Sequence, residues 1–218
     1  MARAVWDADG TRKFSMGTSK GMLFPKTEDG TGYDNGAPWS GLTAVNEDPS
    51  GAEATDLFAD NIKYARLLSA EDYDFTIEAY YYPPEFGPCD GSAEVLAGVR
   101  IGQQTRRPFG FSWETIVGND QNPKAGRVIH IVWNATAQPS QKNHETMNDN
   151  PDAETFSWDC GTLPVPVTGY EPTAVMEVDT TGLSAAKLKA LEDKLYGTDT
   201  TEPTLPTPPD EVIALLKA

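Results

Sequence analysis

The most regular feature of the chain is an alternation of apolar and polar residues with a period of two. From Tyr73 to Tyr80, aromatic and aliphatic side chains fall on one face, whereas acidic and hydroxyl side chains fall on the other. Successive side chains of a β-strand point to opposite faces, so this alternation predicts strands. Both faces of the segment 127–138 are apolar, which predicts a strand covered on both sides. The predicted strands are 62–68, 73–80, 109–115, 127–138, 155–160 and 174–178.

Turn residues separate these strands. Gly118-Asn119-Asp120, Asn150-Pro151-Asp152 and Pro83-Pro84 each lie between two alternating runs. Strands of roughly 6–10 residues at such spacing favour an antiparallel β-sandwich or barrel. No GxGxxG motif follows a strand, and strands do not alternate with helices, so a parallel doubly wound sheet is not predicted.

Helical spacing is clear in one place. Leu188, Leu191 and Leu195 recur on one side of a segment that starts after Ser184, a good N-cap, and stops at Gly197. We therefore predict one helix flanking the β domain. A shorter helical turn is predicted over 52–60.

Two segments have no periodicity. The segment 27–38 holds three glycines, and 198–210 is a Thr/Pro-rich linker that is not expected to pack in a core and ends in a short apolar stretch. We therefore divide the chain into a β-sandwich domain, 1–197, with an extended loop at 27–38, and a Pro-rich C-terminal arm, 198–218. The arm either docks onto a neighbouring subunit or folds back onto its own domain. Trp39, which closes the loop, is either a partner anchor or a core residue.

Charge restricts the partners of the protein. The 218 residues include 33 acids and 17 bases, for a net charge of −16. Such a field disfavours binding to DNA or anionic lipid, but it suits a surface along which DNA slides without adhering. The two cysteines, Cys89 and Cys160, could pair, but they do not resemble a secreted disulfide scaffold. Without a signal peptide or a long apolar run, we expect a soluble chain of a reducing cytoplasm that does not insert into membranes.

An N-terminal motif suggests catalysis. The segment DADGT, from Asp7 to Thr11, matches the DxDGT pattern of aspartate-nucleophile phosphatases. That chemistry needs a buried strand before the motif, followed by a Ser/Thr, a Lys and an acidic pair for Mg²⁺. The sequence offers no such context, and Asp9-Gly10 between short alternating runs predicts a hairpin turn. We expect no catalytic site and no enzyme.

Candidate ligands for metals or cofactors are few. His130 lies in an apolar strand, where a hydrogen-bonded wall residue is a more common role than a ligand, and His144 lies in a polar loop. Cys89 and Cys160 lack zinc-site spacing, and no phosphate-binding loop is present. We therefore expect no metal and no cofactor. The one basic doublet, Arg106-Arg107, is expected either to meet carboxylates of a neighbouring copy or to be solvated.

Several stretches resemble a known family. WSGLTAVNE (39–47), GAEATDLFADNIKY (51–64), TIEAY (76–80), CDGS (89–92), IGQQ (101–104), FSW (156–158) and LEDKLYGTD (191–199) together resemble the major tail proteins of long-tailed bacteriophages and prophages. The likeness runs from about residue 12 to the C-terminus and rests on the order and number of the fragments.

This resemblance implies a tail tube protein. Such proteins have a β-sandwich flanked by a helix, form hexameric rings, and stack around a tape-measure protein into a hollow tube through which DNA passes without specific binding. The loop and the arms commonly bridge successive rings. The implied partners are further copies of the chain, the tape-measure protein, and the tail terminator and distal tail proteins. The implied location is the virion tail, assembled in the bacterial host cytoplasm. The resemblance favours a tail tube that is not surrounded by a sheath.

The candidate site residues follow from this interpretation. An alternative is a carbohydrate- or receptor-binding β-sandwich that uses exposed Tyr80, Tyr81, Tyr82 and Trp39. The candidates for inter-subunit contact are Tyr33, Trp39, Leu42, Arg106, Arg107, Val212, Ile213 and Leu216, and the candidate acids facing the lumen are Asp74, Glu78, Glu114 and Asp159.

Overall fold

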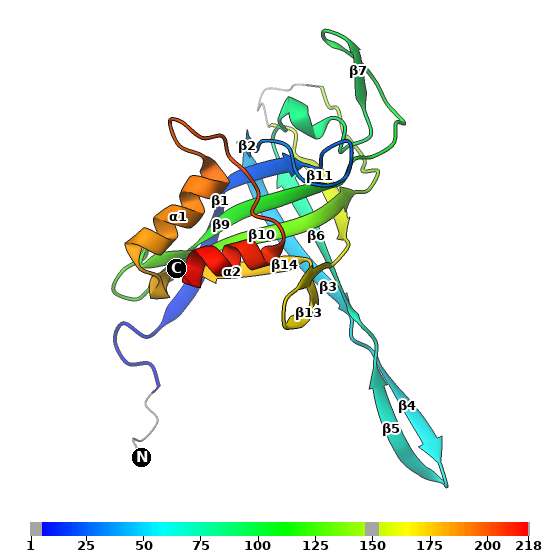
Figure 1. Ribbon diagram of the computed structural model, residues 1–218, viewed down its shortest axis with the longest axis vertical. Helices are drawn as coiled ribbons and strands as arrows, with labels where there is room; N and C mark the ends of the chain where they lie inside the picture. Colours follow the sequence, from blue (N-terminus) through cyan, green and yellow to red (C-terminus); the bar gives the residue numbers. More distant parts are fainter. Residues whose placement is uncertain (1–5, 147–152, 218) are drawn as a thin grey trace.

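The structure is a computed structural model that describes residues 6–146 and 153–217. It is mainly β, with antiparallel sheets and a flanking helix, as the sequence predicts, and it has a second helix that the sequence did not predict (Figure 1). The turn predicted at 150–152 lies outside the described residues. The strands are β1 (Lys13–Pro25), β2 (Ala37–Trp39), β3 (Leu42–Gly51), β4 (Ala54–Ala59), β5 (Ile62–Leu68), β6 (Glu71–Ala79), β7 (Ala93–Leu96), β8 (Val99–Ile101), β9 (Phe109–Asn119), β10 (Gly126–Ala137), β11 (Phe156–Thr162), β12 (Val165–Val167), β13 (Tyr170–Thr173) and β14 (Val175–Asp179). The helices are α1 (Ala185–Tyr196) and α2 (Pro209–Lys217), with 3-10 turns η1 (Pro84–Phe86) and η2 (Thr180–Gly182).

One large antiparallel sheet organises the molecule, in the order β2-β1-β9-β10-β11-β6-β3. One edge of β10 pairs with β9, and the other pairs first with β14 and then with β11. The change of partner follows a register shift beside Asn134, whose φ of 54° marks a bulge. A bulge bends and twists a strand, so it lets the sheet curl over on itself.

The inner core lies between the two halves of the curled sheet. Phe75 of β6 stacks on Phe111 and Trp113 of β9, although two strands separate β6 from β9 in the sheet. Trp39 and Trp158 pack in the same cluster. The arrangement is therefore a sandwich with a largely aromatic interior.

A second core covers the outer face of β10. Ile129, Ile131 and Trp133 point away from the inner core and pack against Leu191 and Leu195 of α1. The predicted burial of both faces of 127–138 is thus confirmed. The helix α1 begins after Ser184, whose side chain accepts a hydrogen bond from the Lys187 backbone N–H, and ends at Gly197, as predicted.

The C-terminal arm packs on this second core. Leu205 and Val212 are buried in it, and the Trp133 indole N–H donates to the Pro206 carbonyl at 2.9 Å. The prediction that the linker packs in no core is wrong, because Leu205, which lies among its threonines and prolines, is buried in the second core. Residues 209–217, predicted only as an apolar stretch, form the helix α2. Of the two alternatives, the structure places the arm on its own domain.

The segment 27–38 does not form an extended loop. The Thr27 backbone N–H donates to the Gly32 carbonyl, and the side chain of Asp29 accepts from Thr27 and Thr31. These hydrogen bonds lower the pKa of Asp29 to about 2. The segment then enters β2, which pairs with β1.

The predicted helical turn over 52–60 is also wrong, because β4 occupies it and pairs with β5. The DADGT segment forms a turn in which the Thr11 backbone N–H donates to the Ala8 carbonyl. This turn precedes β1, and within residues 6–12 no strand comes before it, so it joins no described hairpin. Asp7 and Asp9 are exposed.

Both cysteines are buried and free, so the disulfide that the sequence left open does not form. Burial raises the pKa of Cys89 to about 12 and raises that of Cys160 as well. Neither described helix is long and apolar enough to cross a membrane.

Candidate assembly surfaces

The β4–β5 hairpin projects from the sandwich and ends far from both cores (Figure 1). It continues the ladder of β3 and β6, since the Ala52 backbone N–H donates to the Ala70 carbonyl and the Ser69 N–H donates to the Glu53 carbonyl. Gly51 between the two parts has a φ of 82°, and a Cβ there would lie 2.5 Å from the Ala70 carbonyl oxygen. Only glycine fits this bend without strain.

Apolar side chains on this hairpin are uncovered. Phe58 and Tyr64 are 71% and 70% exposed. A two-stranded ribbon has no third layer, so neither of its faces is buried by the chain itself, and such a hairpin is marginally stable alone. Exposed apolar side chains gathered on one projecting element suit an interaction site. The exposed apolar residues of the hairpin are Leu57, Phe58, Ile62, Tyr64, Leu67 and Leu68.

A smaller hairpin, β7–β8, projects near the opposite end of the molecule (Figure 1). Val95, Leu96, Val99 and Ile101 are exposed on it. The strands β3 and β14 each have one edge without a partner within the residues that the structure describes. Unpaired strand edges can pair with another chain, and exposed apolar patches can mark interaction sites.

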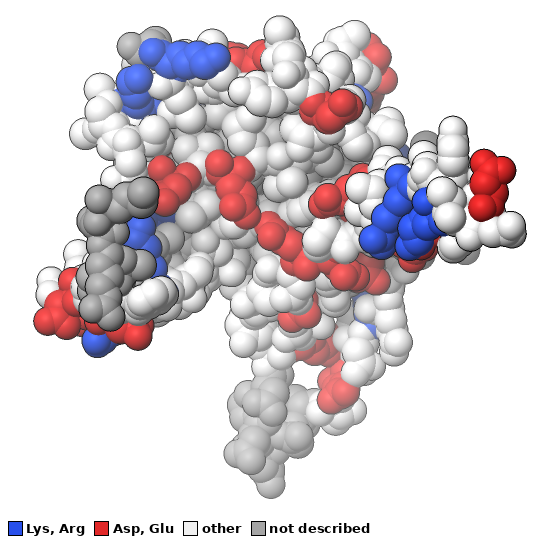
Figure 2. All heavy atoms as spheres, turned by 90° about the horizontal axis from the view of Figure 1, so that it is seen from below, with Lys and Arg blue, Asp and Glu red and all other residues white. Residues whose placement is uncertain are grey.

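An acidic face covers the outside of β3, β6 and β11. Asp74, Glu78 and Asp159 all point to this face, since their neighbours Phe75, Ile77 and Trp158 point into the inner core. Asp48 of β3 lies opposite Asp74. None of the three strands contains Lys or Arg. Figure 2 shows acidic side chains in a band across the middle of the view, with basic side chains mainly at its periphery.

Glu114 does not belong to this face. The prediction that Glu114 faces the lumen of the tube is therefore wrong. It is 3% exposed, because α1 covers the face of β9 to which it points. Its carboxylate accepts from the Tyr196 hydroxyl at 2.7 Å and pairs with Lys20 at 3.3 Å and Arg127 at 3.6 Å. Burial and the neighbouring Glu114 raise the pKa of Tyr196. Glu114 therefore holds α1 on the sheet.

The aromatic anchors expected in the 27–39 region are integrated into the fold. Trp39 is 2% exposed in the inner core and donates its indole N–H to the Tyr81 carbonyl at 2.8 Å, so it offers no exposed anchor. The half-buried Tyr33 accepts from the Asn134 backbone N–H through its hydroxyl. Leu42 is half-buried against the inner core.

The basic doublet meets carboxylates of its own chain, rather than remaining free for a neighbouring copy. Arg107 donates to Asp34 at 2.6 Å, and Arg106 donates to Asp90 at 3.3 Å and to the Ala137 carbonyl. The candidates of the C-terminal arm are likewise engaged. Val212 is fully buried, which corrects its prediction as a free docking residue, and Leu216 packs against the second core, while Ile213 is half-buried on the same helix.

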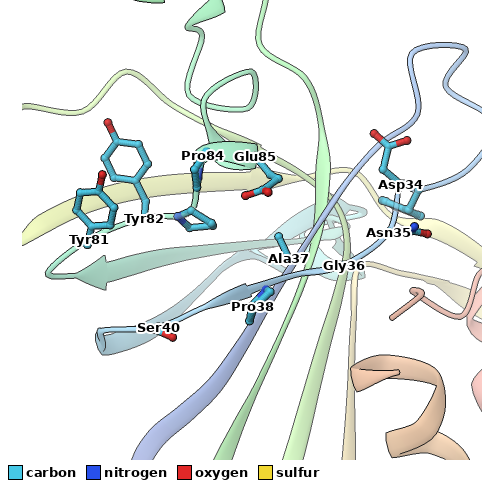
Figure 3. Close-up of a pocket in the computed structure, with 12 residues that line it drawn as sticks. Asp34, Asn35, Gly36, Ala37, Pro38, Ser40, Tyr81, Tyr82, Pro84 and Glu85 are labelled. Carbon is cyan, nitrogen blue, oxygen red and sulfur yellow. The ribbon is translucent and has the colours of Figure 1, made fainter. Parts of the chain in front are cut away.

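A pocket of about 900 Å³ lies beside β2. Figure 3 shows the rings of Tyr81 and Tyr82 side by side at one end, and Asp34 and Asn35 at the other. The two rings stack with centroids 5.6 Å apart. Of the residues in the carbohydrate-binding alternative, Tyr80 and Tyr81 are exposed, whereas Trp39 is not.

Sequence reasoning missed the β4–β5 hairpin as an interaction surface. The signal was the dipeptide Asp60-Asn61, whose φ values of 51° and 64° belong to a type I′ turn. Asp and Asn are among the few residues that tolerate both positions of that turn. A helical turn was predicted over 52–60 instead, and the apolar residues on either side of Asp60-Asn61 were therefore not assigned to a surface.

Comparisons with known proteins add little to this geometry. No protein-family model matches the chain. No curated protein matches its sequence. A chain of the cryo-EM structure of an extracellular contractile injection system, the PVC sheath–tube complex in the extended state, aligns with 80% of this chain and 94% of its own length, at a TM-score of 0.37 and 10% identity. The similarity is coarse, and no conclusion about function follows from it.

Proposed function

We propose that this protein is a structural subunit that assembles with copies of itself into rings, hexameric in the simplest form, which stack into the tail tube of a phage virion. The observation that supports this most is the β4–β5 hairpin. Its apolar side chains lie beyond the reach of the core of their own chain, so only another molecule can cover them. The edges of β3 and β14 offer further pairing to a neighbouring copy.

In this proposal, side-by-side contacts close a ring and the hairpin contacts the adjacent ring. A heterologous contact that closes by rotation gives a ring, whereas stacking of rings is open-ended. The region assigned to bridging between rings is therefore the hairpin, in place of the compact segment 27–38.

The acidic face of β3, β6 and β11 would line the bore of the tube. Negative side chains repel phosphate weakly, so a duplex passes without being held. The proposed partners are a tape-measure protein in the bore and the terminator and distal tail proteins at the two ends. The proposed location is the virion tail.

Assembly of the purified protein tests the proposal directly. We expect rings or tubes by negative-stain electron microscopy and a concentration-dependent increase in sedimentation coefficient, promoted by a coexpressed tape-measure protein. A chain that stays monomeric at high concentration, even with that scaffold present, would contradict the assembly proposal.

The proposed position of the acidic face in the bore leads to a separate prediction. Replacing Asp74, Glu78 and Asp159 with lysine should leave tubes intact and slow genome release by about tenfold or more, because a positive bore retains phosphate. Release is measured by dye uptake on triggered particles. The matched control replaces Glu171, Asp199 and Glu202, three exposed acids outside these strands, with lysine. Equal slowing in both triple variants would show that overall charge, rather than this face, controls the rate.

One observation favours the carbohydrate-binding alternative. The exposed ring of Tyr81 and the carboxylates of Asp34 and Glu85 border the same pocket, a combination that suits stacking on a sugar ring and hydrogen bonding to its hydroxyls. Glycan-array binding by the wild-type protein that is lost in Tyr81→Ala would support this function.

A further inference from the structure

Three strands bring a histidine and two glutamates together at one end of the inner core. His130 of β10 lies directly opposite Glu177 of β14 in the ladder, and Glu47 comes from β3. Each residue is two positions away from a valine that contacts the inner core, so all three side chains emerge on the core side of their strands. These valines are Val45, Val132 and Val175.

The three side chains converge on one point. The Nδ1 atom of His130 lies 3.4 Å from Glu47 Oε1 and 3.5 Å from Glu177 Oε1. All three potential ligand atoms lie within 4.8 Å of one another. In a tetrahedral zinc site with bonds of about 2.0–2.2 Å, neighbouring ligand atoms are about 3.3–3.6 Å apart. The two distances from Nδ1 already fall in this range.

Neighbouring residues hold the imidazole in place. Its Nε2 atom lies 3.0 Å from the Thr115 hydroxyl, and its ring stacks on Trp113 with the planes 2° apart. When Nε2 carries the proton and donates it to Thr115, Nδ1 presents its lone pair to the two carboxylates. A ligating histidine is usually fixed in this way by a hydrogen bond from its other nitrogen. The Tyr73 hydroxyl donates to Glu47 at 3.0 Å and fixes that ligand as well.

The Nδ1 atom of His130 has no hydrogen-bond partner among the described residues. The His130 side chain is 10% exposed, and its Nδ1 makes no hydrogen bond, since neither contact to a glutamate has suitable geometry. Within the part of the chain that the structure describes, neither glutamate has a Lys or Arg partner within 4 Å. An Nδ1 lone pair that faces two carboxylates is unfavourable, and either a proton or a metal ion between these atoms removes the repulsion.

We propose that Glu47, His130 and Glu177 bind one divalent zinc ion that joins the β3 edge to the β14 edge. An imidazole nitrogen with two carboxylates suits zinc better than calcium or magnesium, which prefer oxygen ligands alone. Three protein ligands leave a fourth position for water or a carboxylate. The ion closes the open end of the sandwich, and its role is structural.

Zinc titration of the full-length, tag-free protein tests the site, with calorimetry for affinity and Co²⁺ absorption for coordination. We expect one ion per chain and a higher melting temperature with zinc. Glu177→Gln, on an exposed edge strand, should weaken zinc binding at least about 100-fold while the protein stays folded, and Thr115→Val should weaken it about tenfold. His130→Asn should abolish the Co²⁺ spectrum.

The second histidine provides the control. His144→Asn removes the only other imidazole, which pairs with Glu154 in a polar loop, and should leave zinc affinity unchanged. Absence of zinc binding at equimolar metal in the wild type would overturn the proposal. Equal loss of affinity in His144→Asn and Glu177→Gln would do the same, because it would indicate adventitious surface binding.

Discussion

Replacing Phe58 and Tyr64 with aspartate should abolish the proposed assembly into rings and tubes and leave the monomer folded. This is the largest effect that we expect at the surface. Both side chains are solvent-exposed in the isolated chain, so their loss costs the core nothing. At an interface, each aspartate would be a buried unpaired charge that costs about 3 kcal/mol or more, which lowers an association constant more than about a hundredfold. Electron microscopy and sedimentation velocity measure assembly, and near-UV circular dichroism measures folding.

Tyr170→Asp is the matched control for this experiment. Tyr170 is 77% exposed on β13, outside the β4–β5 hairpin, and carries an aromatic ring of the same kind. We expect this variant to assemble normally. If the double variant of the hairpin still forms tubes, the hairpin is not the contact between rings.

Val212→Asp should destabilise the protein through the second core, and this is the largest stability effect that we expect. Val212 is completely buried among apolar side chains that include Leu191 and Leu195. A buried, uncompensated charge costs about 3–5 kcal/mol. For a chain of this size, each kcal/mol lowers the melting temperature by roughly 2–4 °C, so a loss of about 10 °C is expected. Thermal unfolding followed by circular dichroism measures it.

Ala214→Asp lies two residues further along the same helix on its exposed side, and it should melt within a few degrees of the wild type. The pair of variants also separates the two roles considered for the C-terminal arm. A Val212→Asp protein that melts normally but fails to assemble would mean that the arm leaves its own domain and docks on a neighbour.

The strands could be predicted because alternation is a local property. The sequence around Phe75 and Ile77 shows which residues share a face of β6, and the ladder confirms it. Alternation does not show what covers that face. Glu114 occupies a polar position of β9 just as Asp159 does in β11, yet α1 covers the first and leaves the second exposed.

The other features that the sequence did not predict also depend on contacts between residues that are distant in sequence. Trp39 has the local surroundings of a loop anchor, but pairing of β2 with β1 places it inside the sandwich. His130 was expected to be a hydrogen-bonded wall residue, and its contact with Thr115 fits that expectation. Nothing near it in the sequence indicates Glu47 or Glu177, because curling of the sheet brings them together.

The residues of the second core are synthesised at different times. Trp133, Ile129 and Ile131 leave the ribosome well before Leu205 and Val212, which cover the same face. Until those later residues emerge, the nascent polypeptide exposes an apolar surface and cannot complete its fold. Completion of the second core therefore waits for residues 205–212, and a product truncated before them would be a target for chaperones and proteases.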